Sequence, residues 1–230
     1  MILFIKHIEI EGPETLGAFF VKNGIALEVV NLHKGEKLPR DLSGLEAVVS
    51  LGGPMNVYEE TEYPFLKDED VFLKKVLVKE LPFLGICLGS QLLAKAAGGR
   101  VVRSPQEEIG WFGVELTERG ARDSLFAGLP KVMEVYQWHG DMCQPPADAV
   151  LLATAKSCPV QAFRCGAKAY GLQFHAEITD KSIDAWSKDY APEKQPEREM
   201  MLREYDRVKD QFHQHGQVLC ENFFRIMKGN

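Results

Sequence analysis

A cysteine flanked by glycines, directly after a short apolar run, constrains the fold of this chain more than any other feature. Residues 82–86 read Pro-Phe-Leu-Gly-Ile, Cys87 follows, and Leu-Gly-Ser-Gln continues into a segment typical of a helix. Glycines two residues on either side let a strand and a helix approach closely, so the central residue can occupy a strained, exposed turn. The pattern predicts a nucleophile elbow, in which the helix N-terminus beside the sulfur favours thiolate over thiol.

Taken alone, this five-residue pattern also fits a buried structural cysteine on a strand. Glycine makes up about 7% of average proteins, so flanking glycines occasionally occur by chance. The chain has five cysteines, and we interpret the other four as structural: Cys143, Cys158, Cys165 and Cys220. Other residues have to decide whether Cys87 is a nucleophile.

A histidine and a glutamate two residues apart provide a candidate base. Residues 171–177 read Gly-Leu-Gln-Phe-His-Ala-Glu and follow a run of strand-forming residues. In an extended chain His175 and Glu177 point to one face, so the carboxylate can hold the imidazole while the other ring nitrogen faces a thiol. A histidine near a strand end is by itself more often structural. Pairing with Cys87 favours instead a Cys-His-Glu triad.

A glycine turn after another apolar strand supplies the third motif. Residues 48–56 read Val-Val-Ser-Leu-Gly-Gly-Pro-Met-Asn. Acyl transfer needs hydrogen-bond donors aimed at the developing oxyanion, and a Gly-Gly turn can aim a peptide N–H with no side chain in the way. An ordinary strand-ending turn is the alternative. The glycine turn, the cysteine elbow and the His-x-Glu pair follow one another along the chain.

These three motifs together closely resemble the signatures of the class I glutamine amidotransferases. That family shows a Gly-Gly-Pro turn, then Gly-x-Cys-x-Gly-x-Gln, then His-x-Glu. The run Tyr-Gln-Trp-His-Gly-Asp at residues 136–141 is similar to the segment that lines the glutamine pocket in amidotransferase domains of the GMP synthetase type. The run Glu-Ile-Gly-Trp at residues 108–111 resembles free-standing members of that group. The resemblance covers roughly four fifths of the chain.

The resemblance implies a role for each matching residue. Cys87 would attack the side-chain amide of glutamine and form a γ-glutamyl thioester, and His175, oriented by Glu177, would protonate ammonia and then activate water. The backbone N–H groups of Gly53 and Leu88 would hold the oxyanion.

The resemblance also implies residues that bind the substrate. Gly52, Gln91 and the main chain around Trp138 and His139 would line the pocket, with Gln91 one helical turn after Cys87. For His139, a loop-shaping role without substrate contact is an equal alternative.

Three functions stay open on these residues. The first is a free-standing glutamine amidotransferase-like hydrolase that releases glutamate and ammonia. The chain has no P-loop of the form Gly-x-x-x-x-Gly-Lys-Ser/Thr, so any acceptor of the ammonia would lie elsewhere, for example on a separate synthetase subunit. The second is a γ-glutamyl peptidase or hydrolase, which would use the same thioester chemistry. The third is a non-catalytic regulatory subunit. The presence of all three triad residues argues against this function. A general cysteine protease fits less well than any of these.

Composition limits the binding partners and the cellular compartment that we expect for the protein. A net charge of −6 over 230 residues argues against binding of nucleic acid. No apolar stretch approaches the roughly 20 residues of a membrane span, and the N-terminus is too quickly charged for a signal peptide. An odd number of irregularly spaced cysteines suits a reducing compartment. We expect a cytoplasmic protein without a metal or cofactor, and His213 and His215 make a poor metal pair.

The order of apolar and helical segments predicts an α/β fold. Strand-like runs at residues 2–8, 25–32, 47–51 and 83–86 alternate with helical runs at 14–22 and 65–79. That order favours a mostly parallel central sheet with helices on both faces, as in flavodoxin-like folds and the class I glutamine amidotransferases. Several short strand-like runs between residues 113 and 170 predict antiparallel additions beside it.

The last part of the chain predicts helices. Thr179 or Asp180 is a candidate cap for a helix running to Lys188, and Pro192 and Pro196 interrupt the pattern. Apolar residues then recur with helical spacing over residues 197–227, with a break expected near Gly216. We therefore expect an amidotransferase-like domain over residues 1–190 and a helical extension over 191–230 that packs on the same domain.

Overall fold

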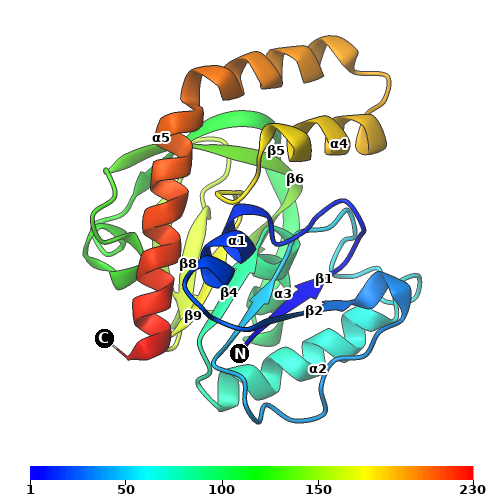
Figure 1. The fold of residues 1–230 in the computed structure, drawn as a ribbon, viewed down its shortest axis with the longest axis vertical. Coiled ribbons are helices and arrows are strands. Elements are labelled where there is room, and N and C mark those ends of the chain that lie inside the picture. Colours follow the sequence, from blue (N-terminus) through cyan, green and yellow to red (C-terminus); the bar gives the residue numbers. More distant parts are fainter. Residues whose placement is uncertain (230) are drawn as a thin grey trace.

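Nine strands form one continuous sheet within residues 1–229, the part of the chain that the computed structural model describes (Figure 1). The strand order is β2-β1-β3-β4-β9-β8-β7-β5-β6. Five neighbouring strands run parallel: β1 (Ile2–Lys6), β2 (Leu27–Asn31), β3 (Ala47–Ser50), β4 (Phe83–Ile86) and β9 (Ala169–Leu172). The predicted α/β class and its parallel strands are confirmed.

Helices cover both faces of the parallel strands because successive strand residues point to opposite sides. The covering helices are α1 (Glu14–Lys22), α2 (Phe65–Val78), α3 (Leu88–Ala96) and the C-terminal α5 (Gln195–Lys228). Ile2 and Phe4 of β1 belong to the buried cluster that includes residues of α1 and α5. The alternate residues, Leu3 and Ile5, belong to the cluster formed with α2 and α3. This arrangement puts the ends of β3, β4 and β9 side by side at one edge.

The antiparallel part of the sheet is larger than the sequence predicts. It consists of β5 (Arg100–Leu116), β6 (Val132–Gln144), β7 (Val150–Thr154) and β8 (Ala162–Cys165). We expected short strands from Gly113 onward, but β5 has 17 residues and β6 has 13. The first half of β5 is mostly exposed and polar, and its register with β6 shifts between Arg103 and Glu108, so hydrophobic alternation does not reveal it. Three 3-10 turns complete the fold: Leu32–Lys34 (η1), Gly120–Arg122 (η2) and Ser124–Phe126 (η3).

The C-terminal region forms two helices. Helix α4 (Asp180–Tyr190) begins after Thr179, whose N–H donates to the Ser182 hydroxyl at 3.1 Å. The expected break near Gly216 is wrong, because α5 is assigned as one helix through this residue. A Cβ on Gly216 would come within 2.5 Å of the Ala176 carbonyl oxygen. This glycine therefore allows α5 to pack closely against the backbone at Ala176 and does not end the helix. The ribbon of α5 instead bends nearer its N-terminal part (Figure 1).

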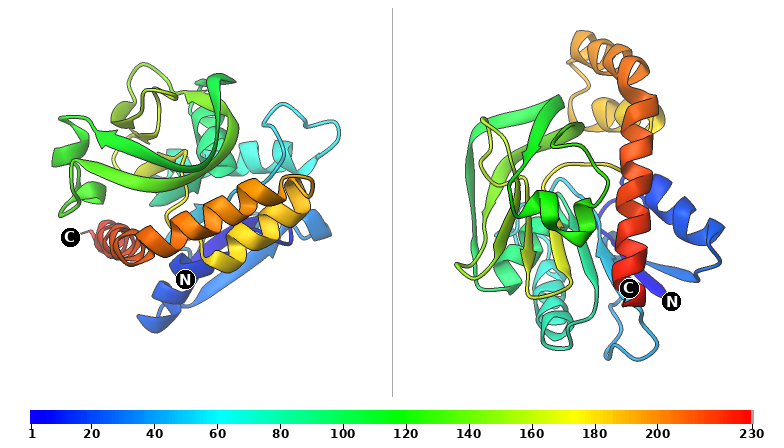
Figure 2. Two further views of the ribbon diagram at one scale, coloured as in Figure 1. Left: turned by 90° about the horizontal axis from the view of Figure 1, so that it is seen from above. Right: turned by 90° about the vertical axis from the view of Figure 1, so that its left-hand side faces the viewer.

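The bend in α5 lets the helix contact several parts of the fold. Its first part lies beside α4 and the curved antiparallel strands (Figure 2), and its later part packs on α1 and η3. The boundary near residue 190 stays a prediction. Within residues 1–229, no helix is both long and apolar enough to cross a membrane.

The Asn222 side chain links α5 to η3 through hydrogen bonds, and removal of this side chain should destabilise the protein. Its side-chain amide donates to the carbonyl oxygens of Leu125 at 2.9 Å and Ala127 at 2.8 Å, and the residue is 2% exposed. Asn222→Ala should lower the free energy of unfolding by about 1–3 kcal/mol, because two buried acceptors lose their donor. Urea denaturation measures this, with the exposed Gln217→Ala as the control. A midpoint equal to that of the control would contradict this linking role.

Candidate active site

Cys87 occupies a strained turn between β4 and α3. Its backbone φ is 50° and its ψ is −106°, a left-handed conformation that few non-glycine residues adopt. The Cys87 N–H donates to the Leu172 carbonyl of β9 at 2.8 Å, which anchors the turn on the sheet. A Cβ on Gly85 would overlap the backbone of Gly89, and a Cβ on Gly89 would overlap the backbone of Ser50. Both elbow glycines are therefore required by close backbone contacts.

His175 and Glu177 lie together beside Cys87. The His175 Nδ1 is 2.7 Å from Glu177 Oε1, and the other carboxylate oxygen of Glu177 accepts from the Ala176 N–H at 2.9 Å. The His175 N–H donates to the Tyr136 carbonyl of β6 at 2.8 Å, which places the histidine after the end of β9. The Trp186 ring of α4 packs edge-on against the imidazole, with centroids 4.7 Å apart. Strands and α4 together hold the histidine in one orientation.

The surroundings of His175 favour the imidazolium. Burial lowers the pKa of His175, but the charge of Glu177 and hydrogen bonds to Cys87 and Glu177 outweigh it. The pKa of His175 is therefore raised well above its usual value near 6.5. A protonated imidazole in hydrogen-bond contact with a thiol stabilises the thiolate. The Cys87 sulfur also lies 3.7 Å from the Gln173 side-chain nitrogen, a further donor.

The glycine turn after β3 meets the start of α3. A Cβ on Gly53 would lie 3.0 Å from a side-chain methyl carbon of Leu88, so the turn and the elbow are in contact. Neither the Gly53 N–H nor the Leu88 N–H donates to any acceptor in residues 1–229. The Leu88 N–H is free because the first N–H groups of a helix have no partner within it. Two backbone donors without an acceptor in the described part of the chain therefore belong to the turn and the elbow that meet beside Cys87.

A buried histidine and glutamate, absent from the sequence analysis, support the glycine turn. His7 Nδ1 donates to the Gly52 carbonyl at 3.1 Å, and its Nε2 is 2.7 Å from Glu69 Oε2. The Ser50 hydroxyl donates to the other Glu69 oxygen at 2.7 Å. Burial lowers the pKa of His7, but the charge and hydrogen bond of Glu69 raise it overall. The pair is 62 residues apart in sequence, so no local spacing indicates it.

A cavity of about 360 Å³ connects these elements. Of the predicted site residues, Gly53, Cys87, Gln91, Trp138, His139 and His175 line it. Gly52, Leu88 and Glu177 are not in its lining, and each contacts a residue that is. A larger groove of about 780 Å³ lies between α1 and α5, and none of the predicted site residues line it.

The segment over residues 138–141 lines the cavity beside Cys87. The Trp138 carbonyl oxygen is 3.8 Å from the Cys87 sulfur, and the Gln91 amide nitrogen is 3.3 Å from the Asp141 carbonyl. His139 Nδ1 donates to the Asp141 carbonyl at 2.8 Å, and Nε2 is 2.8 Å from Glu108 Oε2. Both ring nitrogens of His139 are thus engaged by the protein. This geometry supports the loop-shaping alternative for His139.

Glu108, His139 and Cys158 are the one group among residues 1–229 whose ligand atoms lie close enough to hold a metal ion, within 4.8 Å of one another. Both oxygens of Glu108 already accept hydrogen bonds, from Ser157 and from Gln161, and burial raises the pKa of Cys158 to about 11. A thiol that stays protonated and a fully paired carboxylate are poor ligands. We interpret this cluster as support for the wall of the cavity.

The remaining cysteines differ from Cys87 in their surroundings. Burial raises the pKa of Cys165 to about 11 and that of Cys220 to about 12, and it raises the pKa of Cys143 further. These buried side chains therefore stay as neutral thiols at neutral pH, which agrees with their interpretation as structural residues.

The fold and the site together define an α/β protein with a cysteine on a strained strand-to-helix turn beside a paired histidine and glutamate. A family model described as "Glutamine amidotransferase class-I" matches residues 14–185. The chain therefore belongs to the class I glutamine amidotransferase family, as its motifs predict.

Individual relatives agree with this family. The glutamine amidotransferase-like protein YfeJ of Salmonella typhimurium is 32% identical over 187 residues, covering 79% of this chain and 77% of that protein. A GMP synthase (glutamine-hydrolyzing) of Lactobacillus gasseri is 36% identical over 152 residues, which cover 62% of this chain but only 28% of that enzyme. The crystal structure of a glutamine amidotransferase from Thermotoga maritima matches with a TM-score of 0.88 and 37% identity, over 96% of each chain.

Proposed function

We propose that this protein is a glutamine amidotransferase-like hydrolase that cleaves the side-chain amide of glutamine through a thioester on Cys87. The observation that carries the proposal is the contact of the Cys87 elbow with His175, which Glu177 holds at 2.7 Å within one buried site. Membership of the class I family agrees with this chemistry. The site needs no cofactor for it.

Each proposed step uses a group described above. The Cys87 thiolate attacks the amide carbon of glutamine, and the N–H groups of Gly53 and Leu88 stabilise the oxyanion. Imidazolium at His175 then gives its proton to the leaving nitrogen, the carbon–nitrogen bond breaks, and ammonia departs from the thioester. Neutral His175 next takes a proton from water, whose hydroxide attacks the thioester and releases glutamate and the thiolate.

The fate of the ammonia is a separate part of the proposal. GMP synthases are among the relatives, and the match covers 28% of the length of the Lactobacillus enzyme. We propose that an acceptor for ammonia, such as a separate synthetase subunit, interacts with this chain. The amide of a γ-glutamyl peptide is the second candidate substrate, because Glu11 and Tyr190, which the proposed steps do not use, also line the cavity.

Two substrates test the proposal. The purified protein is incubated separately with glutamine and with a γ-glutamyl dipeptide, and released glutamate is measured, with Cys87→Ala as the control. We expect release of glutamate from glutamine. Release of glutamate from the dipeptide alone would make the protein a γ-glutamyl peptidase. If neither substrate releases glutamate in the absence of a synthetase, mass spectrometry is used to search for acylated Cys87. Absence of acylation would contradict the proposal.

Glu177→Gln should slow the reaction and change its pH dependence. We expect kcat to fall by about 10- to 100-fold, less than the loss of a complete acid–base catalyst, since glutamine still holds the ring. The Glu177 charge raises the pKa of His175, so its removal lowers that pKa. In Glu177→Gln, His175 therefore loses its proton at a lower pH than in the wild type. The alkaline limb of the kcat–pH profile should move to lower pH as a result.

A kcat–pH profile measures this shift, with the exposed Glu118→Gln as the matched control. A Glu177→Gln profile that coincides with the profile of the control would argue against the orienting role of Glu177.

A further inference from the structure

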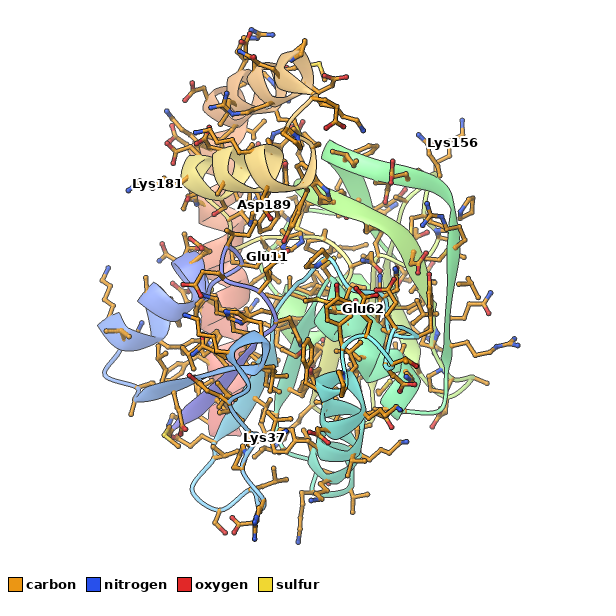
Figure 3. The ribbon with its side chains drawn as sticks, turned by 90° about the vertical axis from the view of Figure 1, so that its right-hand side faces the viewer. Glu11, Lys37, Glu62, Lys156, Lys181 and Asp189 are labelled. Carbon is orange, nitrogen blue, oxygen red and sulfur yellow. The ribbon has the colours of Figure 1, made fainter. Side chains whose placement is uncertain are left out.

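Glu11 is a buried carboxylate at the site that the mechanism above does not use. It lies in the loop between β1 and α1, below α4 in Figure 3, and only 6% of its surface is exposed. The Tyr190 hydroxyl, at the end of α4, donates to Glu11 Oε1 at 2.6 Å. No donor within residues 1–229 is paired with Glu11 Oε2. Both residues line the cavity that contains Cys87.

The second oxygen of Glu11 lies next to the proposed acid–base residue. A Cβ on Gly52 would overlap Glu11 Oε2 and would lie 3.1 Å from His175 Cε1. The glycine therefore brings the carboxylate and the imidazole edge close together on the same side of the cavity. The Tyr190 ring packs on Trp138 with centroids 5.9 Å apart, and Trp186 packs on His175, so each member of the pair has an aromatic neighbour or partner.

The groups around Cys87 indicate that the leaving amine faces the side of the cavity where His175 and Glu11 lie. In the tetrahedral intermediate of the proposed reaction, the oxygen would face the N–H groups of Gly53 and Leu88, and the carbon chain would extend toward Gln91, the predicted substrate-binding residue. The nitrogen has to face His175, which protonates it. Glu11 lies on the His175 side of the cavity, so it meets whatever is attached to that nitrogen.

We propose that Glu11 and Tyr190 form the subsite for the leaving amine, and that this subsite selects γ-glutamyl amides whose leaving group carries a positive charge. The inference rests on the proposed function and names its substrate class. With glutamine the leaving group is ammonia, which is released toward Glu11. With a larger amide, the carbon–nitrogen bond breaks, His175 protonates the nitrogen, and a diamine departs with its second ammonium near the carboxylate.

The chemistry of the subsite supports this selection. Tyr190 satisfies one carboxylate oxygen and leaves the other for the ligand. Burial raises the pKa of Glu11 overall, and the charge of His175 and the Tyr190 hydrogen bond offset this increase only in part. A cation placed beside this carboxylate favours its ionised form, whereas a second carboxylate would be repelled by it.

Three γ-glutamyl amides of similar size test the inference: those of ethylenediamine, propylamine and glycine, with cationic, neutral and anionic leaving groups. We measure kcat/KM for glutamate release. The wild-type protein should prefer the ethylenediamine amide over the glycine amide by at least about 10-fold. Glu11→Gln should reduce this ratio to near unity, mainly through KM, with the rate on the propylamine amide changed least.

Two variants make the test specific. Glu107→Gln is the matched control, because Glu107 lines the same cavity from β5 but is exposed. An equal loss of preference in Glu107→Gln would show general acidity of the cavity and overturn the inference. If Glu11→Gln does not fold by circular dichroism, Tyr190→Phe decides, since it keeps the carboxylate but removes its donor and should reduce the preference partly.

Failure of the inference and failure of the proposed function give different results. Glutamate release from all three amides with ratios unaffected by Glu11→Gln would overturn only the leaving-group subsite. No release from any amide or from glutamine, and no acylated Cys87, would overturn the proposed function and with it the subsite.

Discussion

Cys87→Ala is expected to reduce glutamate release by at least about 10³-fold, because it removes the nucleophile and leaves only binding and the oxyanion donors. Folding should be nearly unaffected. Apart from its hydrogen bond with His175, the sulfur makes only long contacts, 3.8 Å to the Trp138 carbonyl and 3.7 Å to the Gln173 amide, and the backbone hydrogen bonds of the elbow remain. Glutamate release and the mass of the protein after brief exposure to substrate measure the two effects.

Cys165→Ala is the control for this variant, since Cys165 is a buried thiol in β8 outside the cavity. It should keep the rate of the wild type and still form the acyl-enzyme. Residual turnover by Cys87→Ala close to that of Cys165→Ala would show that another group is the nucleophile.

Gly89→Ala is expected to lower the free energy of unfolding by about 3 kcal/mol or more, because the new methyl group would clash with the Ser50 backbone, which cannot move aside easily. A Cβ there would overlap the carbonyl carbon and oxygen of Ser50, and the Gly89 N–H donates to Leu51 at 3.1 Å. Alanine favours a helix by about 1 kcal/mol over glycine, so helix propensity alone predicts the opposite sign. Urea denaturation distinguishes the two effects.

The control for Gly89→Ala is Gly113→Ala. Gly113 lies in β5, its backbone does not need a positive φ, and a Cβ would meet nothing within 4 Å. Its unfolding free energy should change by less than about 0.5 kcal/mol. A stable Gly89→Ala protein would mean that β3 and α3 can separate without cost, which contradicts the close approach at the elbow.

Local patterns predicted the elements that carry the motifs. The strand before Cys87 was expected at residues 83–86 and is found at Phe83–Ile86, because four buried apolar residues bounded by proline and a glycine pattern leave few alternatives. The helix after Thr179 was also found, since its cap is a contact between near neighbours. In contrast, the first half of β5 escaped prediction because its residues are exposed and polar.

Long-range partners of the site were missed for a different reason. Glu11 and Tyr190 are 179 residues apart, and His7 and Glu69 are 62 apart. Each residue alone is an ordinary polar side chain in a loop or helix. Their burial and pairing arise only when β1, α2 and α4 come together around the glycine turn, so no spacing in the chain could have indicated them.

The chain by itself thus determined the family, the parallel strands and the three motifs, because these depend on residue type and on short spacings. The tertiary structure decided which motifs share a cavity, that the charge of Glu177 raises the pKa of His175, and that the Glu11 carboxylate lies in the same cavity. Gly216 shows the difference clearly. Its local propensity predicts a helix break, but in the folded protein its missing side chain admits the Ala176 carbonyl, and packing decides the outcome.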